Sequence, residues 1–322
     1  MTPPRPRRRT LLAAAAGAAV AGATSRVSLA SSDGPGFEAL TGWGDGAFTA
    51  AATALTRYAP FHQALARVDF EAAFRVLPMG EPAHVTAYYE PVLEARAARE
   101  PGFSVPVLGM PPGSAPFPSR GEIMAGALDG VAPVLYWLAD PVDLYFLQIQ
   151  GSGRLSLPDG RLVRLGYGGR NGHRYSSIGR IMRERGILGP NGDGLGVKAW
   201  LRANPTRGAA IMAENRSYVF FTERQGLDPS LGPVGAMGEA LPAGHAVAID
   251  TEHHAYGDLF WLSHPMPDGT PSARLVMAMD TGAAITGPGR VDLFMGTGGQ
   301  AGQMASRVNT QGQLFRLVPR AG

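Results

Sequence analysis

The sequence predicts a mainly β protein of the α+β class. Glycine and proline supply 44 and 27 of its 322 residues, and such frequent chain-breaking residues favour turns and short strands over long helices. The last third of the chain consists of short apolar segments separated by glycine and proline, a pattern typical of strands. Helical spacing of apolar residues is restricted to the first part of the chain and to two middle segments. The length favours two domains.

The first part of the body is predicted to be helical and then extended. Apolar residues recur at steps of three and four along 37–76, which predicts helix that ends by Pro78. Residues 84–92 have the composition of a strand, and Pro91 ends it or places it at a sheet edge. Six prolines within 100–120 predict an extended loop.

The rest of the chain is predicted to contain mostly strands, with two helices and a glycine-rich loop between them. The predicted strands are 134–138, 143–150, 161–165, 218–221, 246–250, 259–262, 274–280 and 291–294. The predicted helices are 176–185 and 199–213, and the predicted loop is 166–172.

Composition and charge exclude several classes of protein. The absence of cysteine excludes disulfides, cysteine–zinc sites, a thiol nucleophile and a lipid carried on an N-terminal cysteine. The chain has no His-Glu-x-x-His pattern, so no metal site is predicted. The formal charge is +3, and five arginines among the first 30 residues account for the excess. The remainder is near neutral, which gives no indication of nucleic acid as a partner.

The N-terminus has the layout of an export signal. A basic start containing Arg8 and Arg9 precedes an alanine-rich stretch, 11–23, that is too short to span a membrane. Two arginines, one spacer and two apolar residues resemble a twin-arginine signal. Small residues favour cleavage after Ala23 or Ala30. We expect a periplasmic protein without a transmembrane segment or lipid anchor, and association with the outer membrane stays open, as does an ordinary secretory signal.

Three aspartates at apolar strands are the first candidates for chemistry. Asp250 and Asp280 each end a predicted strand, and Asp292 lies between apolar residues of another. A carboxyl group beside buried strands has a raised pKa, because burial disfavours its charged form. Such a group keeps its proton near neutral pH and can act as a general acid. The alternative is that these aspartates cap turns.

Asp280 also begins the tripeptide Asp280-Thr281-Gly282, which is typical of aspartic proteases. Those enzymes need two such carboxylates that share one proton. A second copy is absent, because Asp250-Thr251 is followed by glutamate. An aspartic protease therefore stays an alternative that would require a second chain.

Two glutamines suggest a site for an uncharged polar ligand. Alternation along the predicted strand 143–150 would put Gln148 and Gln150 on one face. Amides at a strand end followed by small residues can line a carbohydrate cleft, and the alternative is a solvent-facing strand end. Four further side chains suited to such a cleft are Tyr88, Tyr89, Tyr167 and Asn171.

Six segments of the chain, in order, resemble the membrane-bound lytic murein transglycosylase A family and its three-aspartate (3D) region. They are 86–92 (TAYYEPV), 118–123 (PSRGEI), 148–153 (QIQGSG), 168–173 (GGRNGH), 215–221 (NRSYVFF) and 278–296, which contains AMDTG and VDLFMG. Two positions depart from the family: Ala283 replaces a glycine after Asp280, and Ala255 stands where a proline is expected.

This resemblance implies a double-psi β-barrel with a smaller β domain inserted in it, and a groove between the two that holds a glycan strand. The implied boundaries are a signal peptide at 1–30, a barrel formed by 37–91 and 222–322 with the 3D region at about 240–305, and an insert at 92–221 with helices at its C-terminal end.

By position, the resemblance makes Asp292 the catalytic acid, Asp280 a supporting carboxylate and Asp250 the third aspartate. It places Thr86, Gln150 and the turn Gly151-Ser152-Gly153 in the groove. The full set of predicted substrate-binding residues is Thr86, Tyr88, Tyr89, Gln148, Gln150, Gly151, Ser152, Gly153, Tyr167 and Asn171.

The implied activity is that of a cofactor-free lytic exotransglycosylase acting on peptidoglycan glycan strands. Such an enzyme cleaves the bond between N-acetylmuramic acid and N-acetylglucosamine with a single acid, because the substrate's own 6-hydroxyl closes on C1 to give a 1,6-anhydro product. A non-catalytic peptidoglycan-binding barrel is the alternative. The residues do not distinguish cleavage at chain ends from cleavage within chains, and they leave peptide preference, oligomeric state and protein partners open.

Overall fold

The computed structural model describes residues 34–61, 65–80, 82–189, 192–226, 228 and 230–320. The predicted signal peptide, with its twin-arginine motif and cleavage sites, lies outside these residues and stays a prediction. Within the described ranges, no helix combines the length and apolar character needed to cross a membrane.

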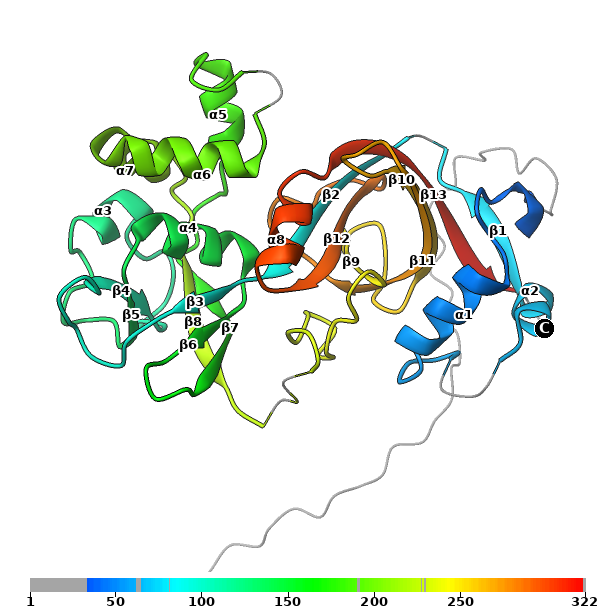
Figure 1. The fold of residues 1–322 in the computed structure, drawn as a ribbon, viewed down its shortest axis with the longest axis horizontal. Helices are drawn as coiled ribbons and strands as arrows, with labels where there is room; N and C mark the ends of the chain where they lie inside the picture. The colour runs from blue at the N-terminus through cyan, green and yellow to red at the C-terminus, as the bar shows by residue number, and fades with distance from the viewer. Residues whose placement is uncertain are drawn as a thin grey trace, which may run out of the picture. The chain divides into compact units, whose positions relative to one another are not determined.

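The larger sheet has seven strands, and six of them pair in a closed ring. The strands are β1 (Phe74–Pro78), β2 (Ala83–Glu90), β9 (Ala246–Ala248), β10 (Leu259–Pro265), β11 (Pro271–Asp280), β12 (Arg290–Thr297) and β13 (Asn309–Pro319). Their order is β1, β13, β10, β11, β9, β12, β2, and β13 also pairs with β2 (Figure 1). Six strands thus form a closed circuit, with β1 attached to β13. The mainly β class is confirmed, and the double-psi description stays a prediction.

The inner face of this circuit forms a core of its own. Side chains alternate between the two faces of a strand, and one set gathers into a fully apolar cluster that includes Val85, Val247, Phe260, Val276 and Leu293. These five come from β2, β9, β10, β11 and β12, so the cluster lies within the closed circuit.

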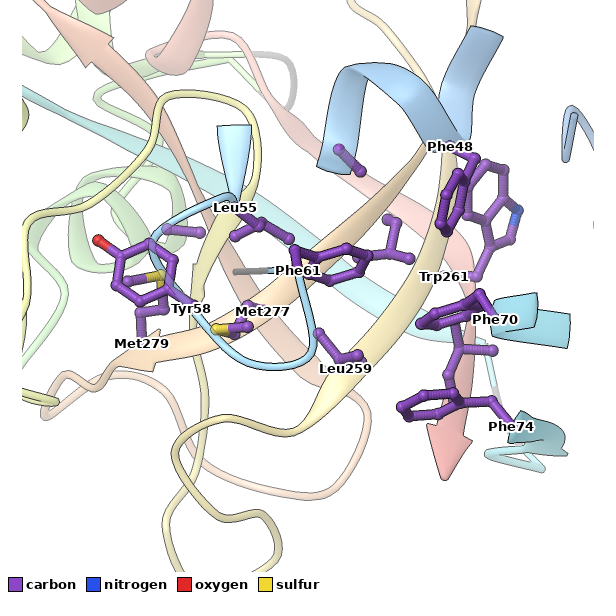
Figure 2. Close-up of a cluster of buried hydrophobic side chains, with 14 of the residues drawn as sticks. Phe48, Leu55, Tyr58, Phe61, Phe70, Phe74, Leu259, Trp261, Met277 and Met279 are labelled. Carbon is purple, nitrogen blue, oxygen red and sulfur yellow. The ribbon is translucent and has the colours of Figure 1, made fainter. Parts of the chain in front are cut away.

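The outer face of the same strands packs against the N-terminal helices. These are a short 3-10 helix (Phe37–Ala39), α1 (Asp45–Ala54) and α2 (Arg67–Ala73). Figure 2 shows Phe48, Phe61 and Phe70 gathered beside Trp261 of β10. The ring centroids of Phe48 and Phe70 are 5.3 Å apart. Because aromatic side chains bury about 150–250 Å² each, this cluster holds the helices on the sheet.

Two smaller sheets are made from the chain between β2 and β9. Their strands are β3 (Val92–Glu94), β4 (Val105–Leu108), β5 (Val134–Leu138), β6 (Gly153–Ser156), β7 (Leu162–Arg170) and β8 (Val219–Arg224). One sheet has the order β3, β6, β7, β8, and the other pairs β4 with β5. The accompanying helices are α3 (Arg120–Met124), α4 (Pro141–Gln150), α5 (Ile178–Glu184), α6 (Gly194–Ala203) and α7 (Pro205–Glu214).

The predicted strand 143–150 is wrong, because these residues form helix α4. Asp140 caps the helix by accepting a 2.8 Å bond from the Val142 amide, and Pro141 takes the first turn. Gly151 ends it with a φ of 77°, a left-handed conformation that glycine adopts without strain. The capping signals at both ends outweighed the alternation of polar and apolar residues between them.

Several other element boundaries differ from the prediction. Residues 199–213 form two helices, since Pro205 lacks the amide that a continuous helix needs. The helical region predicted at 37–76 ends in strand β1, the loop predicted at 100–120 contains β4, and β7 extends into the predicted glycine-rich loop. Strands β3, β6 and β13 and helices α3 and α8 (Gly299–Ala305) were not predicted. The remaining predicted strands and the helix at 176–185 are confirmed, with shifted ends.

Candidate active site

Strand register brings two of the three aspartates into one row. Ala248 of β9 pairs with Asp280 of β11 on one side and with Asp292 of β12 on the other. Asp292 in turn pairs with Thr86 of β2. Because neighbouring strands lie about 4.8 Å apart, the two aspartates are separated by about 10 Å between Cα atoms. Residues far apart in the sequence therefore meet on one face of the sheet.

A β-bulge turns Asp280 towards this face. Met279 belongs to the outer core and Ala278 to the inner one, so regular alternation would turn Asp280 inward. The register between β11 and β9 shifts between Ala278 and Asp280, and such a bulge re-aims the following side chain. Asp280 consequently shares the outer face with Asp292.

Asp292 is a partly buried carboxyl group with one hydrogen-bonded oxygen. The Thr86 hydroxyl donates to its Oδ1, and Arg290 Nη2 donates to Thr86 Oγ1 at 2.8 Å. Burial raises the pKa of Asp292, while the charge of Arg290 and the bond from Thr86 limit that rise. The raised pKa predicted from the apolar neighbours is confirmed, and it suits a general acid.

Asp280 is held by two groups from elsewhere in the chain. The Tyr88 hydroxyl donates to its Oδ2 and the Ala236 amide donates to its Oδ1, both at 2.9 Å. Burial raises the pKa of Asp280, and these bonds oppose the rise. The Tyr88 ring lies 5.3 Å from that of Phe294, which fixes its direction. The resemblance implies that 37–91 and 222–322 form one barrel, and the bond from Tyr88 to Asp280 joins these two segments.

Asp250 differs from the other two aspartates, and the raised pKa predicted for it is wrong. Its Oδ2 accepts a 2.6 Å bond from the Gly287 amide and its Oδ1 a 3.0 Å bond from the Glu252 amide. These bonds favour the charged form and lower the pKa of Asp250. The carboxylate ties the loop after β9 to the loop after β11, as the turn-capping alternative proposed.

Asn171 is buried within the protein and does not face a ligand. Its exposed fraction is 0%. Its Nδ2 donates to the carbonyls of Pro118 and Arg216, each at 2.9 Å, and its Oδ1 accepts from the Tyr218 amide. The prediction that its amide lines a carbohydrate cleft is corrected, because these backbone groups use that amide to join three segments.

The two predicted glutamines point in different directions, because they lie on a helix. Residues two apart on a helix are separated by about 200°. Gln148 is 3% exposed, accepts from Arg120 and donates to the Val219 carbonyl, so it is a structural group rather than a cleft residue. Gln150 lies closer to the aspartates, since its Oε1 accepts a 2.9 Å bond from the Tyr89 amide of β2.

The glycines that follow α4 meet backbone and packing requirements. Gly151 takes the left-handed conformation that ends the helix. A Cβ on Gly153 would lie 2.3 Å from Leu147 Cδ1, so a side chain there would displace the helix or the start of β6. Ser152 between them is buried. This turn is therefore explained without a ligand.

The predicted tyrosines have three different environments. Tyr88 is bonded to Asp280, as described above. Tyr89 accepts a 3.0 Å bond from Lys198 Nζ, and its ring packs against Gly302 of α8, where a Cβ would lie 2.6 Å from it. Tyr167 on β7 is 51% exposed. Tyr167 alone of the three is open enough to stack broadly on a ligand.

Sequence reasoning missed two charged residues, one on β12 beside the row and one at the end of β2. Arg290 lies two residues before Asp292, and period-two alternation would have put both on one face. Glu90, with an exposed fraction of 0%, pairs with Arg154 at 2.7 Å and with Arg164 at 3.1 Å. This buried cluster joins β2 of the larger sheet to β6 and β7 of the smaller one. A glutamate at the end of an apolar strand was the available signal.

A cavity elsewhere among the described residues does not contain the aspartates. It has a volume of about 400 Å³ and is lined by Tyr58, Arg154, Leu241, Phe294 and Thr297 among others. Among all the residues that the structure describes, no three histidine, aspartate or glutamate side chains lie close enough together to hold a metal ion. The row of Asp280, Asp292 and Thr86 is therefore the group of residues best suited to acid chemistry.

Two family models and several curated proteins match this chain. A model described as the MltA specific insert domain matches residues 84–222, and a model of the 3D domain matches 245–318. The membrane-bound lytic murein transglycosylase A of Escherichia coli K12 is 33% identical over 251 residues, covering 74% of this chain and 66% of the relative. That of Vibrio cholerae is 32% identical over 242 residues, covering 72% and 64%. The chain thus spans just under two thirds of these curated relatives.

Solved structures share the fold. A membrane-bound lytic murein transglycosylase from Agrobacterium tumefaciens has a TM-score of 0.77 and 31% identity, covering 89% of this chain and 97% of that one. The structure of Escherichia coli MltA with bound chitohexaose has a TM-score of 0.74 and 25% identity, covering 86% and 90%.

Proposed function

Because this chain belongs to the membrane-bound lytic murein transglycosylase A family, we propose that it is a lytic transglycosylase of peptidoglycan. Its substrate would be the β-1,4 bond between N-acetylmuramic acid and N-acetylglucosamine. The observation that carries this proposal is the partly buried Asp292, whose pKa burial raises and whose Oδ1 is held by Thr86.

The proposed reaction needs one acid. Asp292 transfers its proton to the glycosidic oxygen as the bond from C1 to that oxygen breaks. The 6-hydroxyl oxygen of N-acetylmuramic acid bonds to C1 and closes the 1,6-anhydro ring. Its proton passes to the Asp292 carboxylate, which regenerates the acid. Water takes no part, so a second carboxylate to activate water, as most glycosidases use, is not required.

Asp280 is proposed to support this step electrostatically. It shares the outer face with Asp292. Burial raises the pKa of Asp280, and the bonds from Tyr88 and the Ala236 amide oppose that rise. A negative charge there would stabilise positive charge that develops on the sugar ring. Within this chain, Asp280 and Asp292 do not form the proton-sharing pair of an aspartic protease, because strand β9 lies between them.

Asp250 is proposed to position the loops beside Asp280 rather than to transfer protons. Its bonds to the Glu252 and Gly287 amides support this role. For substrate binding, we propose Thr86 and Tyr88 beside the acids, with Tyr89, Gln150 and Tyr167 as candidates for the wall of the groove.

The division into domains is proposed from sheet membership. All strands of the larger sheet come from 74–90 and 246–319, and all strands of the smaller sheets come from 92–224. This supports a barrel of 37–91 and 222–322 interrupted by an insert at 92–221. The substrate groove is proposed to lie between them.

The named relatives are membrane-bound murein enzymes, which is consistent with an envelope location. We propose, more finely, that this protein is exported to the periplasm by the twin-arginine route. Replacement of Arg8 and Arg9 by lysine should then retain the precursor in the cytoplasm, and normal periplasmic yield of that variant would reject the route.

The activity is tested by digesting purified peptidoglycan in ¹⁸O-labelled water and analysing the products by mass spectrometry. The expected products carry a 1,6-anhydro ring and no label, and Asp292→Asn yields none. Labelled reducing ends would make the protein a hydrolase. Retention on peptidoglycan without any product from the wild type would indicate the non-catalytic binding barrel.

A further inference from the structure

The Arg290 guanidinium contacts the acid's hydrogen-bond partner. Its Nη2 donates to Thr86 Oγ1 at 2.8 Å, and its Nη1 donates to the Val291 carbonyl at 2.6 Å. Strand β12 supplies both Arg290 and Asp292, and Thr86 lies opposite Asp292 on β2. The arginine is therefore anchored by its own strand and directed at a hydroxyl on the neighbouring one.

The chemistry of these groups fixes which atom donates and which accepts in each hydrogen bond from Arg290 to Asp292. A guanidinium can only donate, whereas a hydroxyl donates one hydrogen and accepts through two lone pairs. Thr86 must therefore accept from Arg290, and its single hydrogen is left for Asp292 Oδ1. Since Oδ1 accepts, the proton of the neutral Asp292 carboxyl belongs on Oδ2.

We propose that Arg290 is a positioning residue for the reaction: by ordering the Thr86 hydroxyl, it holds the Asp292 carboxyl with its transferable proton on Oδ2. This inference rests on the proposed function in so far as Asp292 is the acid. Without Arg290, the Thr86 hydroxyl could rotate away, and the carboxyl could present its proton on either oxygen.

The charges around Asp292 predict the direction in which its pKa changes when Arg290 is replaced. The titratable and charged groups that act on Asp292 are Arg290 of β12, Asp280 of β11, His84 and Tyr88 of β2, and Tyr175 from the segment before α5. Arg290 and the Thr86 bond lower the pKa of Asp292, and Asp280 raises it. Loss of Arg290 or of the Thr86 hydroxyl should therefore raise that pKa further, so that Asp292 stays protonated to higher pH.

Turnover of peptidoglycan by Arg290→Gln, Thr86→Val and the double variant tests the coupling. Each single variant is expected to lower kcat by about 10- to 100-fold, the range for loss of one strong hydrogen bond. The KM of Arg290→Gln should stay within about twofold of the wild-type value. Because both residues act through one bond chain, the double variant should be no slower than the slower single variant. Thr86→Ser should recover most of the activity that Thr86→Val loses.

Arg274→Gln is the matched control, since Arg274 is also partly buried but bonds to Ser272 on β11. It should leave kcat and its pH dependence unchanged. Additive losses in the double variant, or a fall in thermal stability with kcat unchanged, would overturn the proposal.

A second measurement does not depend on turnover. Carbon-13 NMR titration of the aspartate carboxyls, with the Asp292 signal identified by its loss in Asp292→Asn, should show a higher pKa for Asp292 in Arg290→Gln and Thr86→Val. An unchanged pKa in both would refute the coupling. If the wild type produces no anhydro product while this pKa shift is observed, the proposed function fails but the bond chain stands.

Discussion

Asp292 and Asp250 both lie at the apolar strands of one sheet, yet their surroundings give them opposite chemistry. Asp292 is partly buried and has one oxygen bonded to a hydroxyl, and burial raises its pKa. Asp250 has both oxygens bonded to backbone amides, which lower its pKa. The difference shows that the balance between burial, which raises the pKa, and accepted hydrogen bonds, which lower it, decides whether such a carboxyl can act as an acid. The apolar sequence on either side does not decide it alone.

The largest effect is expected from Asp292→Asn. Asparagine has the same shape but carries no transferable proton, and general acid catalysis contributes about 10²–10⁴-fold. We expect at least about 10³-fold lower release of anhydro products, with peptidoglycan binding and melting temperature retained. A sedimentation assay with purified cell walls and a thermal melt are the controls. An active Asp292→Asn together with an inactive Asp280→Asn would move the acid to Asp280.

Asp280→Asn should have a smaller effect, because Asp280 acts through its charge and not through proton transfer. We expect kcat to fall by about 10- to 100-fold. Asp280 also raises the pKa of Asp292, so its loss should move the alkaline limb of the kcat/KM profile to lower pH. This shift is opposite to the one expected for Arg290→Gln. Shifts of the same sign in both variants would contradict the electrostatic argument.

The wild-type pH profile should reflect the protonated acid. An enzyme that needs neutral Asp292 loses kcat/KM as pH rises through the pKa of that group, by about tenfold per pH unit. Because burial raises this pKa, the decline should begin above the ordinary aspartate value of about 3.9. A rate that increases through this range would indicate a base instead of an acid.

Asp250→Asn should affect stability more than catalysis. The folded-state pKa of Asp250 is lowered, so its charged form stabilises the fold above the unfolded-state pKa of about 3.9, and this contribution is lost as pH falls through the folded-state value. The melting temperature of the variant should lie below that of the wild type at neutral pH, and the gap should close in acid. Asp129→Asn, at an exposed turn, controls for the loss of one carboxylate. A difference in melting temperature that persists at low pH would argue against stabilisation by the charged Asp250 carboxylate.

Much of the fold could be predicted where local pattern and tertiary context agree. Strands such as β5, β9 and β12 are apolar and bounded by turn residues, so their pattern suffices. Helix α4 was missed because its alternating residues resemble a strand, and only its caps, Asp140 and Gly151, indicate a helix. Strand β13 carries alternating polar residues and was missed because its stability comes from pairing with three neighbours.

For the site, the sequence by itself determined which residues could carry the chemistry. The apolar residues around Asp292 predict its raised pKa, and the collinear motifs identify the family. Composition also limited the choices, since a chain without cysteine has no thiol chemistry. These features could be recognised because each depends on residues close together in the chain.

Only the tertiary structure decided which of those residues act together. The bulge that turns Asp280 outward, the pairing of Thr86 with Asp292 and the bond from the Gly287 amide to Asp250 all join segments separated by 30 or more positions in the chain. A residue's pKa depends on the donors, charges and solvent that surround it in space. For this reason, three aspartates with similar local sequences have different proposed roles. Asp292 is the proposed acid, Asp280 supports it electrostatically, and Asp250 holds two loops together.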